Sequence, residues 1–208
     1  MNNSDSLRIA LPVGRLKDEA LDFLIRCKVL DKSAINYDLR KLTYYDKENN
    51  ITVLFIRNMD IPIYVEYGAC DLGIVGKDLI MEVGADVYEF ADLRFGLCRV
   101  CIAAVKGDGV SFKHDMKIAT KYPKIAKEYF LKKGFAVETI KLYGSIEIAP
   151  IFGLCDLIVD LVSTGETLRK NGLEIVETIF SSSARMIGNK YLTRCKSSIV
   201  NKIMGAIE

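Results

Sequence analysis

The residues with the clearest chemical potential lie between positions 156 and 168. The sequence there reads Asp-Leu-Ile-Val-Asp-Leu-Val-Ser-Thr-Gly-Glu-Thr-Leu, so an apolar run ends in a turn rich in hydroxyl groups and a helical pattern follows. Unpaired backbone N–H groups at the start of a helix bind phosphate. Gly165 lets the backbone approach an anion closely. Hydroxyl donors come from Ser163, Thr164 and Thr167. This segment predicts a phosphate-binding loop.

A Ser-Thr-Gly run by itself is equally typical of a helix cap and turn. The strand before the loop favours a binding site, because alternate residues of a strand share one face. Asp160 therefore interrupts the apolar row between Ile158 and Val162. A carboxylate buried there needs a partner, and a sugar diol is a natural one. The loop is not a Walker A motif, since the Gly-Lys-Ser/Thr ending is absent.

Two other features invite a chemical interpretation and do not support one. Cys98 and Cys101 form a CxxC within an apolar run that reads as a strand. Residues three apart on a strand point to opposite faces, so we expect neither a shared metal nor a disulfide. His114 is the only histidine, and it lies in a polar stretch that reads as a loop. A histidine-based catalytic triad or metal site is therefore not expected.

Composition excludes several classes of protein. The net charge of +2 and the absence of a basic block argue against a nucleic-acid-binding protein. The N-terminal residues are polar, with no apolar signal core, and no apolar run approaches the roughly 20 residues that span a bilayer. We therefore expect a cytoplasmic protein without a membrane segment, whose six cysteines are reduced.

Short apolar runs alternate with helical patterns along most of the chain, which predicts α/β architecture with largely parallel strand pairing. We expect strands at 7–11, 51–56, 71–75, 96–105, 117–120, 137–140, 156–162 and 173–180. We expect helices at about 16–27, 60–68, 77–83, 123–133, 145–152, 167–171 and 191–207. Asp60 is the expected N-cap of the second helix, and Ser181-Ser182-Ser183 is expected to be a polar connection.

One short segment occurs twice. Gly68-Ala69-Cys70-Asp71-Leu72 and Gly153-Leu154-Cys155-Asp156-Leu157 match at four of five positions, and each follows a helical pattern and opens a strand. Two lobes built on the same unit would produce this repeat. We therefore expect lobe I to contain residues 1–95 and 181–208, and lobe II to contain residues 96–180 and the phosphate loop.

These motifs resemble the ATP phosphoribosyltransferases, the family that opens histidine biosynthesis. The family signature matches Glu147, Gly153, Ile158-Val159-Asp160-Leu161 and Thr164-Gly165-Glu166-Thr167-Leu168. Further matches lie at 11–16, 61–68 and 71–78, so the resemblance covers nearly the whole chain. Cys155 stands where the signature usually has Ser, Ala or Gly. Val13 stands where the family often has lysine, so anion binding by this first loop would depend on Arg15.

The resemblance implies a fold and a reaction. The fold is two-lobed, like the periplasmic binding proteins, with the active site in the cleft between the lobes. The reaction joins N1 of ATP to C1 of phosphoribosyl pyrophosphate and releases pyrophosphate. Adenine N1 is a neutral lone pair, so no general base is required. Charge on the departing pyrophosphate must be stabilised, by Mg²⁺ and by guanidinium groups.

The resemblance also assigns site residues. Arg15, Arg40 and Arg57 are the catalytic candidates, on pyrophosphate or the ATP phosphates, although each is also compatible with an ordinary surface charge. Phosphoribosyl pyrophosphate would be bound by Glu147, Asp160, Ser163, Thr164, Gly165, Glu166 and Thr167, with Glu147 and Asp160 on the ribose hydroxyls. ATP would be bound by Gly14, Arg15, Asp71 and Gly73, because a glycine inside a strand suggests close ligand approach. No protein side chain is assigned as a direct metal ligand.

The resemblance further implies a regulatory partner. The chain ends near the point where longer family members begin a regulatory domain, which indicates the short form. That form works as a homodimer within a hetero-oligomer, with a partner that resembles histidyl-tRNA synthetase. Two alternatives remain: a small-molecule sensor of the same fold without turnover, and a salvage phosphoribosyltransferase acting on a free base. Salvage enzymes usually place two adjacent acids before the loop, whereas here Leu161 follows Asp160.

Overall fold

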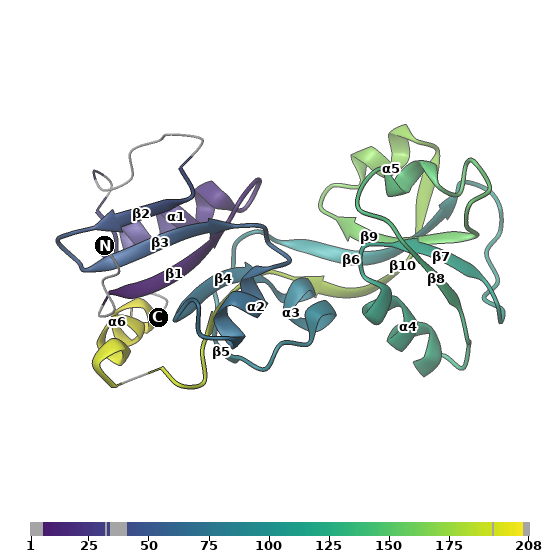
Figure 1. The fold of residues 1–208 in the computed structure, drawn as a ribbon. Helices are drawn as coiled ribbons and strands as arrows, with labels where there is room; N and C mark the ends of the chain where they lie inside the picture. The colour runs from purple at the N-terminus through teal and green to yellow at the C-terminus, as the bar shows by residue number, and fades with distance from the viewer. Residues whose placement is uncertain (1–5, 32, 34–40, 193, 206–208) are drawn as a thin grey trace. The chain divides into compact units, whose positions relative to one another are not determined.

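The chain folds into two compact units (Figure 1). A computed structural model describes residues 6–31, 33, 41–192 and 194–205. The first unit comprises Met1–Gly96 and Ser183–Glu208, and the second comprises Leu97–Ser182. Each unit is built around its own mixed sheet with helices packed against it. The predicted α/β fold with two lobes is therefore confirmed, while the predicted location of the active site between the lobes stays a prediction.

The first unit contains a six-stranded sheet in the order β2-β3-β1-β4-β11-β5. Its strands are β1 (Leu7–Pro12), β2 (Thr43–Asp46), β3 (Ile51–Ile56), β4 (Leu72–Gly76), β5 (Tyr88–Asp92) and β11 (Ala184–Gly188). Its helices are α1 (Lys17–Arg26), α2 (Ile61–Glu66), α3 (Lys77–Val83) and α6 (Arg194–Met204). The side chains of Leu11, Leu24 and Ile74 are fully buried in its core. This core fixes β1, β3 and β4 as a parallel set.

The second unit contains a five-stranded sheet in the order β10-β6-β9-β7-β8. Its strands are β6 (Cys98–Val105), β7 (Lys117–Thr120), β8 (Glu138–Lys141), β9 (Leu157–Val162) and β10 (Leu173–Ser182). Helix α4 (Pro123–Lys132) packs on β7 and β8, α5 (Glu166–Lys170) packs on β10, and a single 3₁₀ turn, η2 (Ile146–Ile148), lies against β9. Here β7 is parallel to both β8 and β9.

The prediction of largely parallel pairing is wrong, because antiparallel pairs form five of the nine pairings between the described strands. β2 and β3 are joined by a tight turn, a connection that only antiparallel neighbours can use. β10 and β11 are separated by Ser183 alone, and each runs against the direction of its neighbours β6 and β4. The predicted polar connection at 181–183 is thus mostly strand.

Several predicted helices are shorter in the structure, two of them by more than two residues at one end. The helix expected at 145–152 is only η2, because Pro150 lacks an N–H to continue the ladder. The final helix covers Arg194–Met204, inside the expected 191–207. Asp60 does precede α2, but its side chain makes no capping hydrogen bond. No helix in the described part of the chain is long and apolar enough to cross a membrane.

The repeated five-residue segment has the same structural role in each unit. The backbone N–H of Asp71 donates to the carbonyl of Arg8 at 2.9 Å, and the Asp71 carboxylate accepts the N–H of Arg8 at 2.8 Å. In the second unit Asp156 forms the same two bonds with Lys117, at 2.9 and 2.7 Å. Each aspartate thus fixes its strand beside the neighbouring parallel strand at their amino ends. The repeat is a register clamp.

The CxxC pair lies on a strand, as predicted. Both cysteines are free thiols on β6. The Cys98 thiol lies 3.8 Å from the carbonyl oxygen of Ser182, while Cys101 is buried with its sulfur 3.5 Å from the hydroxyl of Thr178. His114 lies in a loop, where its Nδ1 accepts the backbone N–H of Ala136.

Candidate active site

The carboxyl ends of the three parallel strands in the second unit bring polar side chains to one edge of the sheet. β7 ends before Lys121, β8 leads to η2 with Glu147, and β9 leads to the predicted phosphate loop. Ligands in open α/β sheets bind at this edge, outside the carboxyl ends of the strands. The loop and the two predicted ribose-binding carboxylates therefore lie where a ligand is expected.

The phosphate loop presents its hydroxyl groups to solvent. Ser163, Thr164 and Thr167 are exposed, and Thr164 Oγ1 accepts the backbone N–H of Glu166 at 3.3 Å. Gly165 has φ +75°, a conformation that side chains disfavour. A Cβ built on Gly165 would lie 3.6 Å from Cγ1 of Val162, which is ordinary contact. The backbone conformation, not crowding, therefore requires glycine here.

Glu166, also in the predicted set, forms an ion pair within helix α5. Its carboxylate lies 2.8 Å from Lys170 Nζ, one helical turn further along α5. Both side chains are well exposed, so this ion pair contributes little to stability. It does direct the Glu166 carboxylate along α5. The backbone N–H of Glu166, rather than its side chain, bonds to the loop, at Thr164 Oγ1.

Asp160 carries the strongest sign of function at this edge. Its half-buried carboxylate accepts the backbone N–H of Leu161 at 2.8 Å. Burial raises the pKa of this carboxyl above its ordinary value; the Leu161 N–H and the charge of Lys121 lower it, and the charge of Glu147 raises it. A carboxyl group whose pKa is shifted by burial and by specific neighbouring charges is typical of a functional site. Asp160 is thus in electrostatic contact with Glu147, as the predicted ribose site requires.

Lys121 was not predicted from the sequence. Thr120 of β7 pairs with Val159 of β9, and the two strands are parallel. One residue further along each chain, Lys121 therefore lies opposite Asp160. Opposed residues of neighbouring strands have side chains on the same face. A lysine directly after a predicted strand is the only sequence signal, and it acquires meaning once β7 and β9 are known to be neighbours.

In the first unit, two predicted catalytic arginines lie at the same sheet edge. Pro12 and Ile56 pair at the carboxyl ends of β1 and β3, and Arg15 and Arg57 follow them along the chain. Both arginines are exposed. Gly14 has φ +81° and forms the turn between β1 and α1. Arg40, the third predicted arginine, lies outside the described residues.

The structure gives different roles to two residues predicted for ATP. Asp71 is the register clamp at the amino end of β4, the end opposite Arg15 and Arg57. Gly73 is indeed closely approached, but by helix α2. A Cβ on Gly73 would lie 2.8 Å from Ile61 and 3.0 Å from Val65. The glycine in this strand therefore allows α2 to pack on the sheet, and nothing about it indicates a ligand.

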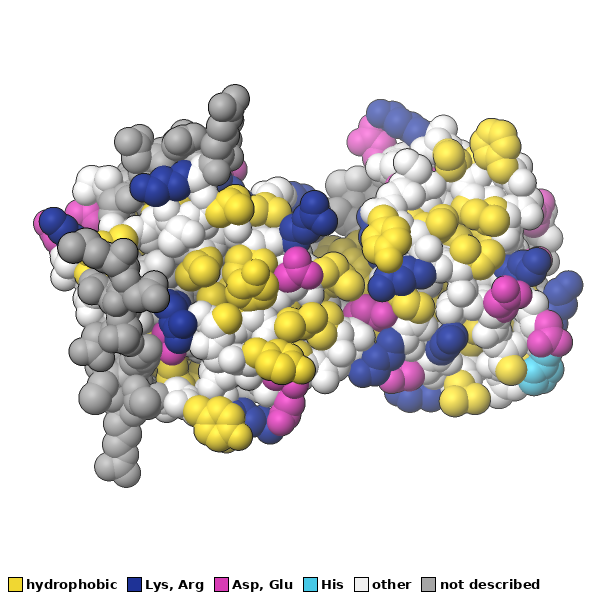
Figure 2. Space-filling view, viewed as in Figure 1, with side chains coloured by type: hydrophobic (Ala, Val, Ile, Leu, Met, Phe, Trp, Pro, Cys, Tyr) yellow, Lys and Arg dark blue, Asp and Glu magenta, His cyan; other side chains and the backbone are white. Residues whose placement is uncertain are grey.

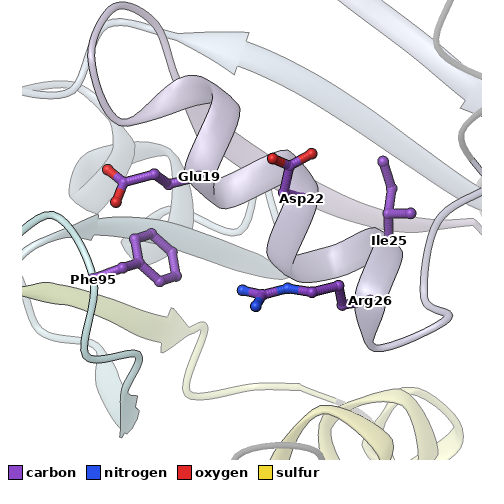
Figure 3. A pocket seen from close by; sticks show the side chains of 5 residues that line it. All are labelled: Glu19, Asp22, Ile25, Arg26 and Phe95. Atoms are coloured by element: carbon purple, nitrogen blue, oxygen red, sulfur yellow. The ribbon is translucent and has the colours of Figure 1, made fainter.

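A pocket of about 370 Å³ lies elsewhere in the first unit, on helix α1 (Figure 3). Its lining side chains are Glu19, Asp22, Ile25, Arg26 and Phe95. Two carboxylates and one guanidinium face an open hollow there, and none of the predicted site residues lines it. In the part of the chain that the structure describes, no three His, Cys, Asp or Glu side chains form a group suited to a metal ion.

Comparison with known proteins identifies relatives over nearly the full chain. The model of the family described as HisG: ATP phosphoribosyltransferase matches residues 57–208. An ATP phosphoribosyltransferase of Clostridioides difficile is 47% identical over 206 residues, covering 98% of this chain and 98% of the relative. Another, of Thermoanaerobacter sp., is 44% identical over 200 residues, covering 96% and 93%. These relatives are about as long as this chain.

Solved structures agree at the level of the fold. An ATP phosphoribosyl transferase (HisG:HisZ) complex from Thermotoga maritima contains a chain that is 31% identical, with a TM-score of 0.82 over 97% of this chain and 98% of that one. The alkanesulfonate-binding protein SsuA from Xanthomonas axonopodis matches with a TM-score of 0.58 at 12% identity, over 97% of this chain and 71% of that one. The second likeness shows the fold alone, and it confirms the predicted resemblance to periplasmic binding proteins.

Proposed function

The chain belongs to the ATP phosphoribosyltransferase family, and from that membership we propose how its own residues carry out the reaction. It is a pentosyltransferase that catalyses the first step of histidine biosynthesis. The observation that carries the assignment of residues is the edge of the second sheet, where Asp160 is in electrostatic contact with Glu147 and the loop at 163–167 exposes its hydroxyls.

Phosphoribosyl pyrophosphate binds at this edge. The backbone N–H groups and hydroxyls of the loop donate to a phosphate group. The carboxylates of Asp160 and Glu147 accept the ribose O–H groups, which Asp160 does best when ionised. Lys121 favours that ionised form, because its positive charge lowers the pKa of Asp160 against the effect of burial. The O–H groups of bound ribose then provide the hydrogen bonds to Asp160 that water provides less well once the carboxylate is partly buried.

The transfer requires no general base. The lone pair of adenine N1 forms the new bond to C1 of the ribose, while the electron pair of the breaking C–O bond leaves with pyrophosphate. Negative charge therefore grows on the leaving group. Arg15 and Arg57 are the guanidinium groups that we propose for that charge, since both are exposed at the carboxyl edge of the first sheet. ATP binding by this edge also remains a proposal.

Mg²⁺ fits this arrangement as an ion shared with the substrate. Mg²⁺ usually keeps several waters and is bound through one or two carboxylates and substrate phosphates. The carboxylates of Asp160 and Glu147 at the edge of the second sheet are of the kind that would hold such an ion. When bound, the ion would neutralise charge on the pyrophosphate group.

The proposal is tested by pyrophosphate release from the purified protein with ATP, phosphoribosyl pyrophosphate and Mg²⁺, alone and with its partner. Release with ATP supports it, and release with a free purine or pyrimidine base instead would indicate a salvage enzyme. Binding of phosphoribosyl pyrophosphate without release under any of these conditions would indicate a sensor.

We expect two glycine substitutions to separate loop function from stability. Gly165 and Gly172 flank α5 with φ of +75° and +72°, and no heavy atom lies within 4 Å of a Cβ built on Gly172. Alanine at either position costs about 1–2 kcal/mol of conformational strain, or roughly 2–8 °C in Tm for a chain of this size. Gly165→Ala should also weaken phosphoribosyl pyrophosphate binding about tenfold, since it displaces the N–H groups of the loop, each worth ~1.5–3 kcal/mol toward a charged partner.

Thermal melts and calorimetry of both variants check this expectation. Similar losses in Tm with a binding defect in Gly165→Ala alone are the expected result. Equal affinity of the two variants for phosphoribosyl pyrophosphate would show that the loop does not belong to the binding site.

We also propose a regulatory subunit for this enzyme, assembled with a homodimer of this chain. The related Thermotoga maritima structure is a HisG:HisZ complex, and the curated relatives are as short as this chain. Unit 1 exposes Ile63, Tyr64 and Tyr67 on and after α2, and Figure 2 shows hydrophobic side chains gathered over this region. Exposed apolar patches mark association surfaces, so this face supports the proposal of association. The expected cytoplasmic location stays a prediction.

We expect histidine to inhibit the assembled complex strongly and the isolated subunit weakly. An effector that acts through a partner requires the partner to bind two states of the catalytic subunit with different affinity. A coupling free energy of about 1–3 kcal/mol corresponds to a roughly 5–150-fold difference in the inhibition constant. Titration of histidine against both preparations measures it. Equally potent inhibition of the lone subunit would place the regulatory site within this chain.

A further inference from the structure

Arg99 lies beside the phosphate loop, on the neighbouring strand. β6 runs antiparallel to β9, and its second residue, Arg99, pairs with Val162, the last residue of β9. The loop begins at the next residue, Ser163. The sequence gives no hint of this proximity, because Arg99 and Ser163 are far apart along the chain.

The side chain of Arg99 is on the face of the sheet over which the loop turns. Cys101 pairs with Asp160, and alternate residues of β6 share a face, so Arg99 is on the same face as Asp160 and Val162. Helix α5 covers this face, because its Leu168 is buried in one cluster with Val162 and Cys101. The loop that joins β9 to α5 therefore passes over the side of the sheet to which Arg99 belongs.

No acidic partner accounts for Arg99. Its side chain is exposed, and among the described residues it forms no ion pair. The acid of the loop, Glu166, is paired with Lys170. Arg185 provides the contrast, because it lies 3.1 Å from Glu89 and 2.9 Å from Asp92 in an evident structural network. Arg99 has the position of a ligand-binding arginine and lacks the contacts of a structural one.

We propose that Arg99 contacts the phosphate group held by the loop at 163–167, as a further binding residue for phosphoribosyl pyrophosphate. This inference rests on the proposed function. A guanidinium group binds phosphate through two parallel hydrogen bonds, which lysine cannot reproduce. With Lys121 directly after the other neighbouring strand, β7, cations flank β9 on both sides. We assign that phosphate to the ribose 5-phosphate moiety, because Arg15 and Arg57 of the first sheet are proposed for the pyrophosphate.

The test is calorimetric binding of ribose 5-phosphate, phosphoribosyl pyrophosphate and pyrophosphate to the full chain carrying Arg99→Met, Arg99→Lys or Lys106→Met. Lys106 is the matched control, since it is an exposed cation just past the other end of β6. Loss of a charge-assisted contact worth ~1.5–3 kcal/mol should weaken ribose 5-phosphate binding by Arg99→Met about 10- to 100-fold. Arg99→Lys should recover only part of the affinity, and Lys106→Met should bind as the wild type does. Pyrophosphate affinity should change less than ribose 5-phosphate affinity.

Steady-state kinetics with the partner present give an independent readout. Arg99→Met should raise the KM for phosphoribosyl pyrophosphate and leave the KM for ATP unchanged. Wild-type affinity for ribose 5-phosphate in Arg99→Met, or in Arg99→Lys if the methionine variant does not fold, would overturn the inference. That result in an enzyme that still releases pyrophosphate defeats this inference alone. Failure of the wild-type protein to bind phosphoribosyl pyrophosphate defeats the proposed function and the inference with it.

Discussion

Arg57→Ala lowers kcat for phosphoribosyl transfer by about 10²- to 10³-fold, the usual cost of removing one preorganised charge contact from a transition state. Arg57 is exposed at the carboxyl end of β3, beside the turn that carries Arg15. Charge grows on pyrophosphate only as the C–O bond breaks, so the lost contact is stronger in the transition state than in the ground state. The loss should therefore appear in kcat more than in the Kd for ATP, measured by rapid-mixing kinetics and calorimetry.

Arg26→Ala is the control for Arg57→Ala. Arg26 is an exposed arginine of the same unit, located on α1 beside the pocket that contains no predicted site residue. Its removal should leave kcat within twofold, the small effect expected of a surface charge. A normal kcat in Arg57→Ala would show that Arg57 is an ordinary surface charge. Arg15 and Mg²⁺ would then be the groups that stabilise the departing pyrophosphate.

The strands that the sequence predicted best are those buried on their inner face. The segment Ile-Thr-Val-Leu-Phe-Ile was expected at 51–56 and forms β3 at Ile51–Ile56. β2, β5 and β11 were not predicted. β2 reads Thr-Tyr-Tyr-Asp and alternates exposed with buried residues, so its four positions carry too little apolar signal. β5 has no buried residue at all. Such strands form because their backbone groups hydrogen-bond to a neighbouring strand, and the local sequence pattern does not reveal that neighbour.

The site divides in the same way between local and non-local information. The phosphate loop and Asp160 were found because one continuous segment contains the strand, the hydroxyls and the glycine. Lys121 and Arg99 lie beside Asp160 and the loop through the pairing of β9 with β7 and β6, so strand order had to be known first. A glycine inside a strand can allow the close approach of a ligand or of a packed helix, and the sequence cannot separate these causes; at Gly73 the structure shows the approach of helix α2.

Asp160→Asn is expected to weaken phosphoribosyl pyrophosphate binding and to stabilise the protein at neutral pH. An ionised carboxylate accepts hydrogen bonds from ribose worth ~1.5–3 kcal/mol each, so the loss of charge on two such bonds should cost about 10²-fold or more in Kd. Burial raises the pKa of Asp160, which means that ionisation at pH 7 opposes folding. Asparagine removes that opposition while keeping the size of the side chain.

The pH dependence of this stabilisation follows from the direction of the shift. The folded pKa of Asp160 lies above its unfolded value, which is about 3.9. The carboxyl therefore favours the folded state fully below that unfolded pKa, and this contribution is lost as the pH rises through the folded pKa. Asp160→Asn should have the higher Tm at pH 7, by a few degrees if the difference approaches 1 kcal/mol. The difference should shrink as the pH falls through the folded pKa and should vanish below about 4.

Asp156→Ala should show the opposite behaviour, because Asp156 is the register clamp of β9 and has no proposed contact with substrate. Its carboxylate accepts the N–H of Lys117 at 2.7 Å, at the amino end of the strand. Loss of that bond should lower Tm by about 2–6 °C, from ~0.5–1.5 kcal/mol of net hydrogen-bond free energy. Affinity for phosphoribosyl pyrophosphate should be retained. Melts from pH 3 to 8 and calorimetry at pH 7 separate the two aspartates. A lower Tm for Asp160→Asn at pH 7 would show that burial of Asp160 does not oppose folding, and wild-type affinity in that variant would remove it from the ribose site.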